Sequence, residues 1–115
     1  MTTLRYHKDE RIHLLTLDGH ANYGEAGADI VCAGISAISY TLMGYLENLK
    51  AEKVWAMYRT DEGSVAIECM RHPKADTAFD MAMIGYAQIA NKYPDNLSIN
   101  ISVIDGDSRE QTLNN

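Results

Sequence analysis

A cysteine and a histidine with the chemistry of a nucleophile and a base lie close together in this sequence. His20 and Cys32 are twelve positions apart, in the stretch GHANYGEAGADIVCAG. An imidazole that contacts a thiol can take its proton and so activate the sulfur as a nucleophile. The same imidazole can later protonate a leaving amine. The pair therefore indicates nucleophilic catalysis, provided that the fold brings the two side chains together.

The elements around this pair predict how they are positioned. An apolar strand over 12–17 ends at Asp18-Gly19, so His20 lies just past a strand end. Asp29 is expected to be the N-cap of a helix over about 30–49, because apolar residues follow it at a spacing of three to four. Cys32 then lies in the first helical turn, where unpaired N–H groups and the helix dipole favour a thiolate. The same N–H groups are expected to stabilise an oxyanion.

Further residues of this stretch have candidate roles beside a simpler structural one. Asp29 could orient His20 as a third catalytic member, but capping its own helix is the simpler role and is favoured. Tyr23 either lines a substrate groove or anchors the loop. Gly24 and Gly27 predict that the loop 21–28 is mobile in the free protein and orders over a substrate as a gate. Ser36, one turn after Cys32, either approaches the site or allows close packing.

The other cysteine and histidines carry weaker signals. Cys69 lies in an alternating strand and is predicted to pack in the core. His7, His13 and His72 are predicted to be surface or turn residues. The sequence has no CxxC pair, and nothing in the spacing makes the histidines converge, so we expect neither a metal site nor a cofactor.

Composition narrows the class of protein. The chain has 115 residues, a size typical of one domain over 1–115, and 46% of them are apolar. A net charge of −6 disfavours nonspecific binding to nucleic acid. We expect no membrane span and no signal peptide, because the apolar runs are short and the N-terminus is polar. These features predict a cytoplasmic protein with two free thiols, and a homodimer would add burial to a modest core.

The pattern of apolar residues predicts an α+β fold in the order β-β-α-β-β-α-β, with two helices packed on a mixed or antiparallel sheet. Asp61-Glu62-Gly63 indicates a hairpin turn, and Pro94 stops the second helix. The tail after about residue 105 is expected to be frayed or disordered. The expected strands are 2–6, 12–17, 54–59, 64–70 and 97–103, and the expected helices are 30–49 and 75–93.

The block GHANYGEAGADIVCAGISAI resembles the signature of the ribosomal-processing cysteine proteases, known as Prp. In that family a Gly-His-Ala motif ends a strand, a glycine-containing loop follows, and an Asp-Ile-Val-Cys-Ala motif opens a helix. Only the block 19–37 is specific, although IANKYPDNLSINI near the C-terminus is loosely similar. Ile35, where valine is common, and the variable stretch Asn22-Tyr23 are mild departures.

The resemblance implies a small α+β domain, commonly a homodimer, that works as a Cys–His peptidase. His20 matches the base of the family and Cys32 matches its nucleophile. The implied task is to remove an N-terminal extension from a large-subunit ribosomal protein (number twenty-seven). Phage-related members act on capsid or scaffold proteins. Two alternatives stay open: a protein that binds the ribosomal precursor without cutting it, and a redox-sensing thiol.

Overall fold

The computed structural model describes residues 1–20 and 29–104, together with the backbone of 110–114. The element order predicted from the sequence is confirmed as far as the fifth strand, with boundaries that differ by a few residues. The elements are β1 (Thr2–Lys8), β2 (Ile12–Asp18), α1 (Ile30–Asn48), the short 3-10 helix η1 (Leu49–Glu52), β3 (Ala56–Asp61), β4 (Ser64–Met70), α2 (Pro73–Lys92), β5 (Leu97–Ile104) and β6 (Glu110–Asn114).

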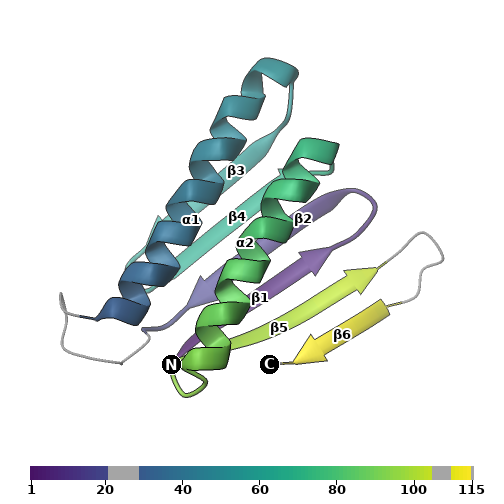
Figure 1. Cartoon of the computed structure of the whole chain (residues 1–115). Helices are drawn as coiled ribbons and strands as arrows, with labels where there is room; N and C mark the ends of the chain where they lie inside the picture. Colours follow the sequence, from purple (N-terminus) through teal and green to yellow (C-terminus); the bar gives the residue numbers. More distant parts are fainter. Residues whose placement is uncertain (21–28, 105–109, 115) are drawn as a thin grey trace.

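The strands form one mixed sheet in the order β3-β4-β2-β1-β5-β6. The β1–β5 pair is parallel and the other four pairs are antiparallel. Both helices lie on the same face of the sheet, with α1 over the β3 and β4 side and α2 nearer to its centre (Figure 1). This is the predicted α+β layer arrangement.

The C-terminal tail differs from the expectation. The sequence predicted a frayed or disordered tail after about residue 105, but the backbone of Glu110–Asn114 forms β6, antiparallel to β5. Its register pairs Ile101 with Leu113 and Val103 with Gln111. The polar composition of this segment contains no alternation of apolar residues, so the pairing was not visible in the sequence.

Alternating side chains of the central strands face the helices and form the core. In register, Leu4 of β1 lies beside Leu17 of β2 and Ile99 of β5, and Leu15 of β2 lies beside Ile67 of β4. All five are buried. The helices contribute the facing stripe, which consists of Val31, Ile35, Leu42 and Leu46 from α1 and Ala75, Phe79, Ala82, Tyr86 and Ala90 from α2.

The segment Ile30–Glu52 is long and apolar enough to cross a membrane by length and composition alone, which the sequence analysis did not expect. This is weak evidence for a span, since core helices of water-soluble proteins pass the same test. Here one face of α1 packs on the sheet through its buried stripe.

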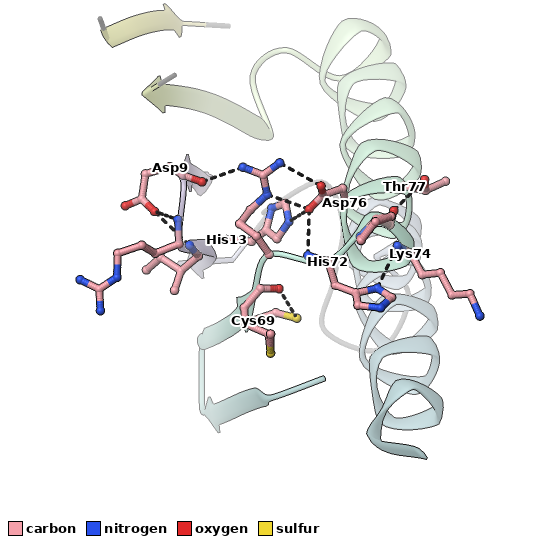
Figure 2. A network of polar contacts seen from close by, with 12 residues as sticks. Asp9, His13, Cys69, His72, Lys74, Asp76 and Thr77 are labelled. Carbon is pink, nitrogen blue, oxygen red and sulfur yellow. Dashed lines mark hydrogen bonds and ion pairs between the residues drawn. The ribbon is translucent and has the colours of Figure 1, made fainter. Parts of the chain in front are cut away.

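His13 is completely buried, so the prediction that it is a surface or turn residue is wrong. It lies on the helix-facing side of β2, two residues before Leu15, and therefore points into the core. Its ring contacts the hydroxyl of Tyr6. It also contacts Asp76, as Figure 2 shows. Asp76 is bound in addition by Arg71. A polar network therefore closes one end of the layer between the sheet and α2.

The other two histidines outside the stretch 19–34, and the second cysteine, have structural roles. His72 is the N-cap of α2, and its Nδ1 accepts a hydrogen bond from the N–H of Lys74. His7 is half-buried and bonds to Asp9. Cys69 is buried in the core, as predicted, and burial raises the pKa of its thiol to about 11.

Candidate active site

The pairing of β2 with β4 places the β3–β4 turn beside His20. These strands are antiparallel, and Asp18 at the end of β2 is paired with Ser64 at the start of β4. The two-residue turn before Ser64 therefore lies next to the residues that follow β2. The N–H of Gly19 donates a hydrogen bond of 2.8 Å to the carbonyl of Gly63, which fixes the exit from β2 against this turn.

Gly19 is required where β2 ends, on two grounds. Its φ of +97° lies in the left-handed region that side chains disfavour. A Cβ at this position would also lie 2.5 Å from the backbone oxygen of Met1. The N-terminal backbone is itself held there, because the N–H of Thr2 donates to the carbonyl of Asn96. The residue before His20 is thus enclosed between the start of β1 and the β3–β4 turn.

Asp29 caps α1, as predicted from the sequence. One carboxylate oxygen of Asp29 accepts hydrogen bonds of 2.9 Å from the N–H groups of both Val31 and Cys32. The carbonyl of Asp29 accepts from the N–H of Ala33 at 3.1 Å. Cys32 therefore lies in the first turn of the helix, with its main chain tied to Asp29.

The cap also bears on the predicted oxyanion site. The N–H groups of the first helical turn are expected to stabilise an oxyanion, and in this structure those of Val31 and Cys32 donate to the carboxylate of Asp29. The N–H of Ala33 makes the first regular bond of the helix, to the carbonyl of Asp29. A capping side chain satisfies only part of the donors of the first turn, so the oxyanion role stays a prediction.

His20 and Cys32 line the same cavity, which has a volume of about 290 Å³. Residues from the N-terminus, the end of β2, the first half of α1 and the β3–β4 hairpin surround it. The structure therefore brings the base and the nucleophile predicted from the sequence to one hollow of the surface. Its other lining residues are Thr2, Leu17, Gly19, Ile35, Ser36, Ser39, Tyr40, Met43, Thr60, Asp61, Gly63, Ser64 and Val65.

The other predicted site residues divide into two groups. Ser36 lines the cavity with Cys32, as its spacing of one helical turn predicted. Tyr23, Gly24 and Gly27, and the gate proposed for the loop 21–28, lie outside the described residues. Among the residues that are described, no group of three or more His, Cys, Asp or Glu side chains is placed to hold a metal ion.

One whole wall of the cavity is not predicted by the sequence. Thr60, Asp61, Gly63 and Val65 belong to the β3–β4 hairpin, which the sequence predicted as a hairpin but without a partner. The Asp-Glu-Gly turn was the available signal. The turn alone does not show which strand β4 pairs with. That pairing, and its register against β2, joins two strands that lie on either side of α1 in the sequence.

A second missed feature holds the two helices together behind the cavity. The hydroxyl of Ser39 donates to the carbonyl of Ile35 and lies 2.6 Å from the hydroxyl of Tyr86 on α2. Both side chains are buried. Burial raises the pKa of Tyr86 to about 12, so this phenol stays neutral. The bond links α1, which carries Cys32, to α2.

Comparison with known proteins gives a consistent result. The family model described as cysteine protease Prp matches residues 1–98. The ribosomal processing cysteine protease Prp of Mycoplasma genitalium is 32% identical over 89 residues, which cover 76% of this chain and 87% of the relative. The protein of the same name from Staphylococcus aureus is 29% identical over 86 residues, covering 73% and 81%.

Solved structures share the fold. The S. aureus protease with a covalently linked product peptide superimposes with a TM-score of 0.80 at 24% identity, covering 88% of this chain and 99% of the other. A protein from Streptococcus mutans gives 0.72 at 26% identity, covering 90% and 95%. The residues that match the family model include His20, Cys32 and every other residue that lines the cavity. The chain therefore belongs to the cysteine protease Prp family and is a cysteine peptidase.

Proposed function

We propose that Cys32 is the nucleophile and His20 the general base of a cysteine endopeptidase that removes the N-terminal extension of a large-subunit ribosomal protein (number twenty-seven). The observation that carries the assignment of roles is that both side chains line one cavity although the chain between them spans the β2–α1 connection. Cys69 is not a candidate nucleophile, because it is buried and its raised pKa keeps it a thiol.

The proposed reaction is acyl transfer in two steps. His20 takes the proton of the Cys32 thiol, and the sulfur attacks the scissile carbonyl. The tetrahedral intermediate collapses when His20 protonates the leaving amine, which leaves an acyl-enzyme. His20 then activates a water molecule that hydrolyses the thioester and regenerates the thiol.

Two features of the cavity support a peptide as the substrate. Its lining has both apolar side chains, such as Ile35, Met43 and Val65, and polar groups, such as Ser36 and Asp61. Its volume is near the lower end of the range of about 300–1,000 Å³ for ligand sites. The proposed ribosomal precursor comes from the relatives, which are named as ribosomal processing proteases, one of them in a complex with a substrate peptide.

The test is cleavage of the purified precursor, followed by mass spectrometry of the product. We expect one cut that releases the N-terminal extension. Cys32→Ala and His20→Ala should abolish product while leaving the circular dichroism spectrum unchanged. Cys69→Ala is the matched control, since it removes the other thiol and should keep cleavage. Full activity of a folded Cys32→Ala protein would overturn the proposal.

The same assay separates the alternatives. A protein that binds the precursor tightly but yields no product is a non-cleaving partner of ribosomal assembly. Cleavage of a phage capsid or scaffold protein, with the ribosomal precursor left intact, identifies the phage-type activity. A thiol that oxidises reversibly and cuts neither protein is a redox sensor.

We further propose that the enzyme is a homodimer and acts in the cytoplasm, where its thiols stay reduced. Apolar side chains on the outer surface of the helix pair support the dimer, because Tyr45 and Met81 are 41% and 69% exposed. A groove of about 490 Å³ between α1 and α2 lies in the same surface, lined by Ile38, Tyr45 and Met81. Sedimentation velocity should give a dimer for the wild type and a monomer for Met81→Lys.

A further inference from the structure

Gly63, in the turn between β3 and β4, lies beside the ring of His20. A Cβ built on Gly63 would lie 3.3 Å from Nε2 of His20, 3.7 Å from Cε1 and 3.9 Å from Cδ2. The edge of the imidazole that carries Nε2 therefore faces the space that a side chain at Gly63 would occupy. A contact at 3.3 Å is tighter than ordinary van der Waals contact, so a side chain there requires the ring to shift by a few tenths of an ångström.

The same residue is tied to the main chain of the histidine. Its carbonyl accepts the 2.8 Å hydrogen bond from the N–H of Gly19, the residue that precedes His20. Gly63 thus fixes the backbone on one side of His20 and limits the space of its ring. No other glycine of the described chain has a histidine ring against it.

We propose that Gly63 is a positioning residue of the proposed peptidase, which sets the place of the His20 imidazole relative to Cys32. The inference rests on the proposed function of His20. Gly63 does not touch the scissile bond in this proposal and acts only through the ring. Catalytic groups must be held within about 0.5 Å of the productive geometry. A displacement of about 1 Å can cost about a hundredfold in rate.

Gly63 also has a conformational reason to be glycine, which must be separated from the positioning role. Its φ of +71° lies in the left-handed region. Asparagine tolerates this region better than alanine does, and both add a Cβ. A purely conformational role therefore predicts that Gly63→Asn behaves like the wild type and that Gly63→Ala is unstable. The positioning role predicts that both variants lose activity, whatever their stability.

The experiment compares Gly63→Asn, Gly63→Ala and His20→Ala with the wild type and with Glu62→Ala as the control. Glu62 is the other residue of the turn and does not line the cavity. We expect kcat on a peptide that spans the cleavage site to fall about three- to tenfold in both Gly63 variants, with KM within about twofold of the wild-type value. Glu62→Ala should keep both constants.

Alkylation of Cys32 by iodoacetamide, followed across pH 5–9, gives a readout that needs no substrate. If Gly63 positions the imidazole, the profile of the Gly63 variants shifts toward that of His20→Ala. Wild-type kcat and a wild-type alkylation profile in folded Gly63→Asn would overturn the inference while the proposed function stands. Wild-type cleavage by His20→Ala would instead overturn the proposed function itself.

A measurement on the unmodified protein covers the case in which neither Gly63 variant folds. The geometry predicts nuclear Overhauser effects between an Hα proton of Gly63 and the ring protons of His20, because a Cβ in the direction of that proton would lie 3.7 Å from Cε1 and 3.9 Å from Cδ2. Their presence supports the contact on which the inference depends. Their absence in a well-assigned spectrum overturns it.

Discussion

The Nε2 atom of His13 lies 2.6 Å from Oδ1 of Asp76, across the layer between β2 and the first turn of α2 (Figure 2). Nδ1 of the same ring lies 2.7 Å from the hydroxyl of Tyr6, so both ring nitrogens are bound. Phe79 stacks on the imidazole with the ring centroids 4.3 Å apart. This buried histidine therefore joins the sheet to α2, at the other end of β2 from His20.

Replacement of Asp76 should cost a large part of the stability. Its carboxylate also binds Arg71 through two hydrogen bonds of 2.8 and 2.9 Å, and Arg71 in turn donates to the carbonyl of Asp9. Asp76→Ala leaves a buried imidazole and a guanidinium without their acceptor, so we expect a loss of about 2–4 kcal/mol in the free energy of unfolding. Urea denaturation measures it.

Asp80→Asn is the matched control for that measurement. Asp80 lies one turn later on α2, is exposed, and makes no hydrogen bond or ion pair within the described part of the chain. Its replacement should change the free energy of unfolding by less than about 0.5 kcal/mol. Equal losses in the two variants would show that helix charge, and not the His13 network, accounts for the effect.

The same network predicts that stability falls on acidification. Burial lowers the pKa of His13 below its usual 6.5, against the opposing effect of Asp76. The unfolded chain therefore binds a proton at this position at a higher pH than the folded protein does. The free energy of unfolding must then decrease as the pH falls below about 6.5, by at most about 1.4 kcal/mol per pH unit.

Asp76 adds a second loss at lower pH. The hydrogen bond from Arg71, and after it that from His13, hold the pKa of this carboxyl well below its usual value of 3.8. Its contribution is present above that value and is lost as the pH falls through the acid range. Two separate windows of destabilisation are therefore expected.

His13→Gln isolates the upper window. Glutamine keeps an N–H donor for Asp76 but does not titrate, and the other three histidines are common to both proteins. Urea midpoints between pH 7 and pH 5 should fall in the wild type and stay flatter in the variant, even if the variant is less stable at pH 7. Parallel curves would contradict the assignment to His13.

Features that depend on residues close together in the sequence could be predicted, and features that depend on distant residues could not. The cap at Asp29 and the position of Cys32 in the first turn follow from neighbours within four residues, and both are confirmed. His13 was misplaced because a histidine between apolar strand residues has no local sign of a distant acceptor such as Asp76. Its partner is 63 positions away.

The walls of the active-site cavity could not be predicted from the sequence either. The contact between Gly63 and His20 depends on strand register, and register is set by the pairing of whole strands. The oxyanion role expected of the first-turn N–H groups stays a prediction, and the cap shows only that those of Val31 and Cys32 donate to Asp29 in this structure.

Two substitutions at Asp29 separate its capping role from an orienting role toward His20. Asp29→Ala removes the acceptor of two N–H groups and should cost about 1 kcal/mol of stability. Asp29→Ser restores a cap without the charge. If Asp29 only caps, the serine variant regains both stability and kcat/KM. Regained stability with activity still reduced would assign Asp29 a role toward the catalytic pair, and urea denaturation with peptide cleavage measures both.

Gly19 and Gly44 provide a matched pair of glycine-to-alanine substitutions with opposite expected effects. At Gly19 a Cβ lies 2.5 Å from the oxygen of Met1 and φ is +97°, so Gly19→Ala should destabilise the protein by about 2 kcal/mol or more. At Gly44, in the exposed middle of α1, a Cβ meets nothing within 4 Å, so Gly44→Ala should stabilise by about 0.5–1 kcal/mol. Thermal and urea unfolding of the two variants check both signs.

Because Gly19 also fixes the backbone where β2 leads into His20, cleavage should fall with Gly19→Ala even at temperatures where the variant is fully folded. Normal cleavage by the folded variant would show that the backbone at Gly19 does not position the base.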